Sequence, residues 1–216
     1  MTLTATDPRL GDPPLPDHLR LILVRHGQTL ANREHRLQGA SDDPMTEVGQ
    51  EQAALLGALL APIALDKIIS SDLKRSMQTA QAIANYHQLP VEGTPLLREW
   101  NCGEWDGWPA SRFLQLMEEQ KLKVSELAPP GGERLHEVRA RACQALAHVM
   151  AEGMGKTTML CSHGDFLRTL ISCVLDVPID TANAFRFENA SYTILDFDGT
   201  SWNMMAMSCI PLPWVK

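Results

Sequence analysis

The sequence lacks any apolar run long enough to cross a membrane, for which roughly 18 residues are needed. Its N-terminal segment also lacks the apolar stretch of a secretory signal peptide. Proline and aspartate are frequent there instead, so residues 1–18 are expected to form a flexible leader. The remainder, 19–216, has an ordinary single-domain length and is expected to form one domain.

Basic residues are in short supply. The chain holds 19 Lys and Arg against 26 Asp and Glu, a net charge of −7 with a pI near 5.5. This balance argues against nucleic acid or an anionic membrane as the main partner. It also makes any local cluster of Arg and His more informative, because the composition does not supply one.

Cysteine pairs with metal-binding or redox spacing are absent. The five cysteines include no C-x-x-C motif, and their number is odd. This usage predicts reduced thiols and a cytoplasmic protein.

Strand-like and helix-like segments alternate along the chain. Short buried-looking strands are expected at 20–25, 67–70, 91–97 and 157–162, helices at 46–61, 72–86, 133–152 and 165–175, and a β pair at 191–197 and 201–207. Residues 99–132, rich in Trp, Gly and Pro, are expected to leave the sheet as a cap-like excursion. The predicted fold is α/β, a three-layer sandwich with a mostly parallel sheet, helices on both faces and an antiparallel edge strand.

Two of the predicted strands run directly into His-Gly. The first ends in Arg25 and His26, and the second ends in Ser162 and His163. Ligands of such sheets bind outside the carboxyl ends of the strands, so these side chains are expected to meet there. Arg75, in the first turn of a predicted helix, opposes the helix dipole unless an anion lies nearby. Together these groups indicate a phosphate or carboxylate pocket, and the planar fork of Arg suits phosphate best.

Seven ordered blocks resemble the histidine phosphatase superfamily, the phosphoglycerate mutase-like proteins. They are R-H-G-Q-T at 25–29 with Asn32 and Gln38-Gly39, D-x-P-x-T-x-x-G at 42–49, S-S-D-L-x-R-x-x-Q-T-A at 70–80, L-R-E-x-x-x-G-x-W-x-G at 97–107, P-G-G-E at 130–133, S-H-G at 162–164 and N-A-S at 189–191.

The resemblance implies a covalent mechanism without a metal or other cofactor. His26 would attack phosphorus and become a phosphohistidine, which requires a neutral imidazole. Arg25, Arg75 and His163 would hold the phosphoryl oxygens, with Asn32, Gln38 and Gly164 as further substrate-binding residues. Glu99 would protonate the leaving oxygen and later activate water, and Trp100 and Trp105 are expected to raise its pKa by excluding water.

Within the family, a phosphatase acting on a small phosphorylated metabolite is favoured. Glu99 is followed by Trp, Asn and Cys, whereas mutases typically carry Arg and then Tyr-Gly, and residues 108–128 hold no paired Arg. The block pattern looks most like the α-ribazole phosphatase branch. Phosphoglycerate mutase-type transfer and a non-catalytic phosphate-binding protein remain the alternatives.

Two features leave alternatives open. Arg134 either faces the pocket, which would indicate a second acidic group on the substrate, or faces solvent at the start of a helix. Trp202, Trp214 and the apolar tail at 210–216 are candidates for a homodimer contact.

Overall fold

The computed structural model describes residue 12 and residues 14–211. Most of the expected leader at 1–18, and Trp214 in the tail, lie outside the described residues. Among the helices of the described part, none is long and apolar enough to cross a membrane. The cytoplasmic location stays a prediction.

Six strands form one sheet in the order β3-β2-β4-β1-β5-β6. β1 pairs with β4, β4 with β2, and β2 with β3 in parallel, whereas β5 runs antiparallel to β1 and β6 antiparallel to β5. The strands are β1 (Leu19–Arg25), β2 (Lys67–Ser71), β3 (Val91–Thr94), β4 (Thr157–Ser162), β5 (Tyr192–Phe197) and β6 (Trp202–Cys209). The predicted mostly parallel sheet with an antiparallel edge is therefore confirmed.

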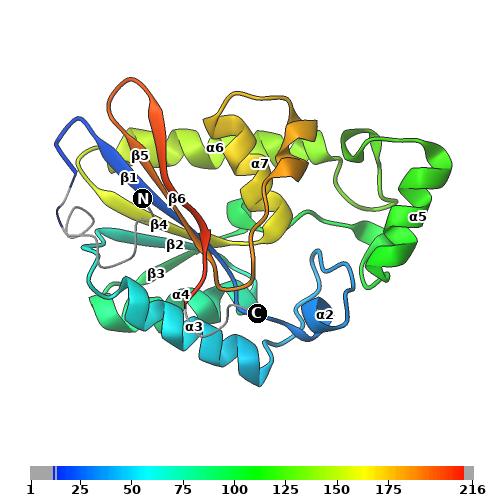
Figure 1. Cartoon of the computed structure of the whole chain (residues 1–216), viewed down its shortest axis with the longest axis horizontal. Helices are drawn as coiled ribbons and strands as arrows, with labels where there is room; N and C mark the ends of the chain where they lie inside the picture. Colours follow the sequence, from blue (N-terminus) through cyan, green and yellow to red (C-terminus); the bar gives the residue numbers. More distant parts are fainter. Residues whose placement is uncertain (1–11, 13, 212–216) are drawn as a thin grey trace.

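Helices cover both faces of this sheet, as expected for a three-layer sandwich (Figure 1). One face packs against α3 (Glu47–Leu60) and α4 (Lys74–His87), the other against α6 (Leu135–Gly153) and α7 (Gly164–Val174). Successive strand residues point to opposite faces, so Leu21 and Leu23 join the α6 and α7 core while Ile22 and Val24 join the α3 and α4 core. Burial on both faces explains why the strands read as continuous apolar runs.

Residues 99–132 leave the sheet as expected and contain η2 (Gly103–Trp105), α5 (Ala110–Gln120) and η3 (Val124–Glu126). Figure 1 shows α5 beyond the carboxyl ends of the parallel strands. The ring centroids of Trp105 and Trp108 lie 5.7 Å apart, and that of Phe113 lies 6.1 Å from Trp105. This aromatic cluster extends the hydrophobic core beneath α6 and α7 into the excursion. The division into leader, single domain and cap stays a prediction.

Outside the 99–132 excursion, three short elements were not predicted: α2 (Leu30–Arg33), η1 (Pro95–Leu97) and η4 (Ile179–Ala184). η1 replaces the second half of the strand expected at 91–97, because Pro95 cannot donate to a strand ladder and instead opens a turn. These segments are too short for a hydrophobic period to reveal them.

The expectation of five reduced thiols is wrong for two of them. Cys143 of α6 and Cys173 of α7 form a disulfide, with 5.7 Å between their Cα atoms. The two helices pack side by side, which brings together cysteines that are 30 residues apart and show no recognisable spacing. Cys102, Cys161 and Cys209 are free. Trp202 packs on Phe197, with 5.2 Å between ring centroids, and the homodimer stays a prediction.

We expect a thiol assay on the denatured protein to detect three free thiols before reduction and five after reduction. Cys143→Ser should lower the free energy of unfolding by about 2–4 kcal/mol, because a cross-link across such a loop restricts the unfolded chain. A thiol assay in denaturant, with and without reductant, counts the free thiols. Urea unfolding measures the free energy of unfolding. Five thiols before reduction would contradict the pairing. Cys209→Ser, which removes a free thiol, is the matched control for the stability measurement.

Candidate active site

The two His-Gly strand ends meet, as the sequence predicts. Arg25 and Ser162 are paired in the β1–β4 register, so the next residues, His26 and His163, are neighbours. The backbone N–H of His26 donates to the Ser162 carbonyl at 3.1 Å, and the two imidazole centroids lie 5.0 Å apart. Parallel strands that end together thus deliver both imidazoles to one point.

His26 presents one ring nitrogen for chemistry. Its Nδ1 lies 2.8 Å from the Gly27 carbonyl oxygen, which only accepts, so Nδ1 carries the proton and Nε2 keeps its lone pair. Gly27 is required here, because a Cβ would lie 2.3 Å from the Gly49 carbonyl oxygen at the start of α3. Burial, and then the charges of Arg75 and Arg25, hold the pKa of His26 well below its usual range. The imidazole is therefore a neutral base at physiological pH.

Arg75 is fully buried and is hydrogen-bonded to His163, which lies beside His26. Its Nε donates to His163 Nδ1 at 3.1 Å, and its two terminal nitrogens donate to the carbonyl oxygens of Ser41 at 2.6 Å and Gly39 at 2.9 Å. These acceptors, together with the charges of Glu99 and Asp42 nearby, offset the cost of burying the guanidinium. The unusual position of Arg75 in the first turn of α4 thus serves to anchor the 39–41 loop beside the nucleophile.

His163 is also fully buried and caps the start of α7. Because Nδ1 accepts from Arg75, Nε2 carries the proton and donates to Ser71 Oγ at 2.8 Å. Burial and the Arg75 charge keep its pKa well below the usual range. Neither Arg75 nor His163 lines the cavity that opens in front of His26. His163 lies beside His26, Arg75 is hydrogen-bonded to His163, and the role of both as direct phosphate ligands stays a prediction.

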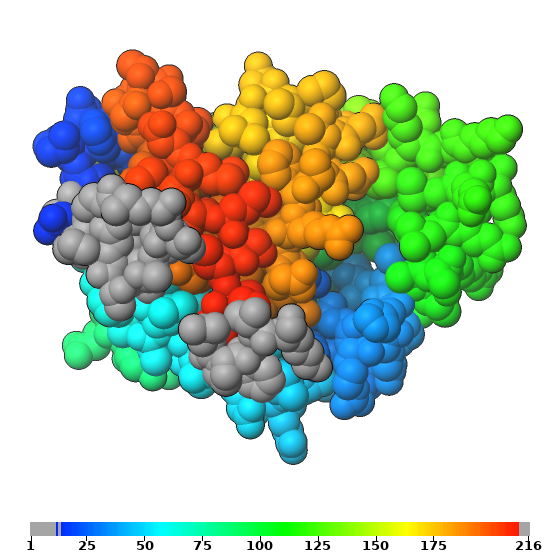
Figure 2. Space-filling model, in the orientation of Figure 1, coloured from blue at the N-terminus to red at the C-terminus, as the bar shows by residue number. Residues whose placement is uncertain are grey.

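A cavity of about 520 Å³ opens in front of His26. Figure 2 shows the surface hollowed where the 180–190 segment, the 99–132 excursion and the segment around residues 30–38 meet. Six of the predicted site residues lie on its wall: Arg25, His26, Asn32, Gln38, Glu99 and Gly164. Arg25 Nε and Gln38 Nε2 are buried and have no hydrogen-bond partner among the described residues. The cavity therefore offers several donors beside a neutral nucleophile.

Asn32 is held by its own helix and by the N-A-S block. Its Oδ1 accepts from the Thr29 backbone N–H at 3.1 Å and from Asn189 Nδ2 at 2.9 Å. The same Nδ2 donates to the His26 carbonyl oxygen at 3.1 Å. With its oxygen engaged, Asn32 turns its amide N–H groups toward other acceptors. Asn189 is a site residue that the sequence motif contained but to which no role was assigned.

The Glu99 carboxylate faces the N-terminus of α7. It accepts from the backbone N–H groups of Asp165 at 3.1 Å, Phe166 at 3.0 Å and Trp100 at 3.0 Å. Burial, and then the nearby Asp165 charge, raise the pKa of Glu99 against these donors. The pKa of Glu99 is raised, as the sequence predicts, but the backbone N–H of Trp100 acts to lower it. A raised pKa is what a carboxyl needs in order to act as a general acid.

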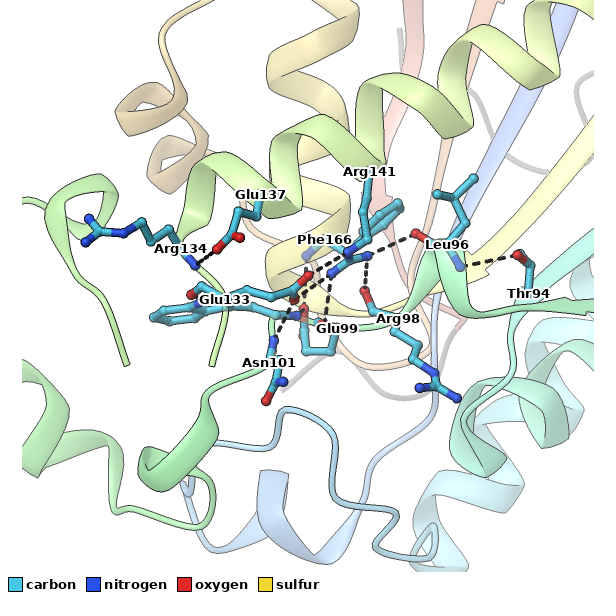
Figure 3. A network of polar contacts seen from close by, with 11 residues as sticks. Thr94, Leu96, Arg98, Glu99, Asn101, Glu133, Arg134, Glu137, Arg141 and Phe166 are labelled. Atoms are coloured by element: carbon cyan, nitrogen blue, oxygen red, sulfur yellow. Dashed lines mark hydrogen bonds and ion pairs between the residues drawn. The ribbon is translucent and has the colours of Figure 1, made fainter. Parts of the chain in front are cut away.

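Arg141 of α6 holds the segment that carries Glu99 (Figure 3). It donates to the carbonyl oxygens of Leu96 at 3.0 Å, Arg98 at 3.0 Å and Glu99 at 3.3 Å. Its other contacts are both carboxylate oxygens of Glu133, at 2.8 and 2.9 Å. Glu133 in turn accepts from the Asn101 backbone N–H at 3.0 Å. No sequence motif marks Arg141, so its role could not be predicted.

Arg134 faces solvent. It precedes the first turn of α6, its side chain is exposed, and its backbone N–H donates to Glu137 at 2.6 Å. Figure 3 shows its guanidinium pointing away from Glu99. The solvent-facing alternative is therefore correct. Instead, His35, Arg36, Asp165 and Arg168 line the cavity, and nothing in their spacing reveals this.

No group of three or more His, Cys, Asp or Glu side chains in the described part of the chain is arranged to hold a metal ion. Catalysis without a metal or other cofactor stays a prediction.

Comparison with known proteins places these motifs in a family. The profile of the histidine phosphatase superfamily (branch 1) matches residues 21–210. A probable phosphoglycerate mutase GpmB of Yersinia pestis (strain Pestoides F) is 36% identical over 188 residues, which cover 85% of this chain and 87% of that protein.

Solved structures give the same result. A mycobacterial glucosyl-3-phosphoglycerate phosphatase in complex with VO3 has a TM-score of 0.80 at 29% identity, covering 88% of this chain and 99% of the other. A candidate alpha-ribazole-5'-P phosphatase from Escherichia coli has a TM-score of 0.79 at 26% identity, covering 88% of this chain and 97% of the other.

We expect His26 to make the folded state less stable in acid. The unfolded imidazole takes up a proton near its ordinary pKa of about 6.5, whereas the folded one resists protonation, so stability falls as the pH drops below that value. His26→Asn removes this contribution. Between pH 7.5 and 5.5, wild type should therefore lose about 1 kcal/mol more than the variant.

Urea unfolding of both proteins at the two pH values measures this difference. The exposed His136 provides the control, because His136→Asn should keep the wild-type dependence. An equal loss in wild type and His26→Asn would show that His26 is not held neutral.

Proposed function

The chain belongs to branch 1 of the histidine phosphatase superfamily, and we propose that it hydrolyses phosphate monoesters of small metabolites through a phosphohistidine on His26. The family that the seven sequence blocks resemble is thereby confirmed, as is the α/β fold. The substrate class and the covalent intermediate are the proposal.

The observation that carries this proposal is that His26 and Glu99 line one cavity and have pKa values shifted in opposite directions. His26 is a neutral imidazole whose Nδ1 proton is fixed, while Glu99 is a carboxyl whose pKa is raised. Two titratable groups with environments that separate their pKa values are the mark of a base and an acid that act together. A nucleophile and a proton donor are what phosphoryl transfer to a side chain requires.

In the proposed first step, His26 Nε2 forms a bond to phosphorus as the bond to the ester oxygen breaks. Arg25, on the cavity wall, offsets the charge of the phosphoryl oxygens. Glu99 gives its proton to the leaving alcohol. In the second step, Glu99 takes a proton from water, water oxygen attacks phosphorus, and the bond to Nε2 breaks, which regenerates neutral His26.

Water as the acceptor distinguishes a phosphatase from a mutase. In favour of hydrolysis, Glu99 is followed by Trp, Asn and Cys, and the one Arg of α5, Arg112, lies over the Trp108 ring at 3.6 Å. The relatives carry both kinds of name, a phosphoglycerate mutase and phosphatases. Transfer from a bisphosphorylated donor is the alternative. A non-catalytic binding protein would have no need to retain both His26 and Glu99.

His26→Ala should abolish hydrolysis of an aryl phosphate in the presence of EDTA, with a loss of more than about 1,000-fold in kcat. The exposed His136→Ala is the control and should keep wild-type turnover. Retained turnover in His26→Ala would contradict the nucleophile assignment. If wild type itself fails with aryl and alkyl phosphates, hydrolysis is wrong, and phosphate transfer from a bisphosphorylated donor tests the mutase.

Glu99→Gln should slow poor leaving groups more than good ones, because only an alkoxide needs the proton that Glu99 supplies. We expect kcat to fall by about 100-fold for an alkyl phosphate and much less for a nitrophenyl phosphate.

Arg141→Lys should show the same pattern more weakly, because one ammonium cannot replace the guanidinium contacts that position Glu99. Arg139→Lys, on the same helix, is the matched control, since Arg139 donates to the distant Val177 carbonyl. Equal losses for both leaving groups would contradict the role of Glu99 as acid and of Arg141 as its positioning residue.

A further inference from the structure

Asp106 belongs to the G-x-W-x-G part of the 97–107 block, but the proposed chemistry gives it no part. It follows η2 in the 99–132 excursion. Its carboxylate accepts from the backbone N–H groups of Gly39 at 2.9 Å and Ser41 at 2.9 Å, and from Ser41 Oγ at 3.3 Å. The excursion is therefore hydrogen-bonded to the loop at residues 39–41 through the Asp106 side chain.

The same two loop residues also accept from Arg75. Its terminal nitrogens donate to the Ser41 carbonyl at 2.6 Å and to the Gly39 carbonyl at 2.9 Å. Asp106 thus holds the N–H group, and Arg75 the C=O group, of each residue. Hydrogen bonds that are linked in this way strengthen one another. The 39–41 loop is a bridge between a carboxylate of the excursion and a buried guanidinium of the active site.

Close packing limits how far this loop can move. A Cβ at Gly39 would lie 2.7 Å from both the Trp100 carbonyl oxygen and the Cys102 nitrogen. The loop therefore touches the backbone that directly follows Glu99, besides accepting the contact from Asp106. Because packed interiors have little free space, a shift of the loop at one end is passed on to its other contacts.

The charge of Asp106 also acts on Arg75. Burial lowers the pKa of Arg75, whereas the charges of Glu99, Asp42 and Asp106 act to raise it. These carboxylates offset part of the cost of keeping a buried guanidinium charged. Asp106 does so while it also holds the loop whose carbonyl oxygens accept from that guanidinium.

We propose that Asp106 is a positioning residue for catalysis, which holds the 39–41 loop so that its carbonyl groups fix Arg75 against His163. Arg75 Nε donates to His163 Nδ1 at 3.1 Å, and the imidazole centroids of His163 and His26 lie 5.0 Å apart. The excursion thereby helps to build the surroundings of the nucleophile. This inference rests on the proposed function only where turnover is measured.

Asp106→Asn is the variant that tests the inference, and we expect it to fold. Asn has the shape of Asp, and backbone hydrogen bonds join the excursion to the segment around Leu37 without the Asp106 side chain. Gly107 N–H donates to the Leu37 carbonyl at 2.9 Å, and Leu37 N–H donates to the Trp108 carbonyl at 2.8 Å. The Asn NH2 group cannot accept, so one of the two loop N–H groups loses its partner.

A double-mutant cycle with Arg75→Lys separates positioning from a general structural role. One ammonium cannot keep the three contacts of the Arg75 guanidinium. Asp106→Asn alone should lower kcat/KM for an aryl phosphate about 10- to 100-fold, as small misplacements in an active site do. In the Arg75→Lys background it should cost about twofold or less, because the contact through which Asp106 acts is already lost. The exposed Glu104→Gln, on the same segment, is the matched control and should keep wild-type turnover.

Nitrogen NMR of the His163 ring gives a readout that does not depend on turnover. In wild type, Nδ1 accepts from Arg75 and Nε2 carries the proton, so the two nitrogens should have well-separated shifts. Asp106→Asn should weaken the donation to Nδ1 and move the two shifts toward each other, as Arg75→Lys should. Glu104→Gln should leave them unchanged. The His163 signals are identified by their loss in His163→Asn.

Three results would overturn the inference: wild-type kcat/KM in Asp106→Asn, an equal loss from Asp106→Asn in both backgrounds, or His163 nitrogen shifts that Asp106→Asn leaves unchanged. Moved shifts in Asp106→Asn without turnover by wild type would sustain the inference and contradict the proposed function. Turnover by wild type with unmoved shifts in Asp106→Asn would do the reverse.

Discussion

One end of the sheet holds the buried side chains of Arg75, His26 and His163 beside the partly buried Arg25, and this is the constraint on which the rest of the structure depends. Positive charge inside a protein needs oxygen acceptors close by. Arg75 finds them in the carbonyls of Gly39 and Ser41, and Arg25 finds one in the carbonyl of Phe187. The loops around the cavity are thus fixed by the charges they surround, and burial together with these charges keeps His26 neutral.

The acidic side of the cavity is built by a second set of contacts. The start of α7 provides backbone N–H groups to Glu99, and Arg141 holds the segment from which Glu99 projects. α6 and α7 are further joined by the Cys143–Cys173 disulfide. Burial nevertheless raises the pKa of Glu99. One cavity therefore holds a base whose pKa is lowered beside an acid whose pKa is raised, each by its own surroundings.

Much of this arrangement could be predicted from the sequence, because strands and motifs fix it locally. Apolar runs that end in His-Gly predict β1 and β4. The parallel pairing of these two strands brings His26 and His163 together. Contacts between distant elements could not be predicted. The rotation of the helices against the sheet decides whether Arg75 lines the cavity or is buried away from it. It also decides whether Arg141 or Arg134 reaches the Glu99 segment. The same packing pairs Cys143 with Cys173 and places Arg168 on the cavity wall, and no sequence pattern records it.

The central claim is that Nε2 of His26 carries the phosphoryl group. The most direct test is to quench turnover of an aryl phosphate rapidly in alkali. The protein is then digested, and the phosphorylated peptide is examined by phosphorus NMR. The structure predicts an acid-labile phosphohistidine at residue 26 with phosphorus on Nε2, because the Gly27 carbonyl holds the Nδ1 proton. Phosphate on Nδ1, on His163, or on no residue during sustained turnover would contradict this account.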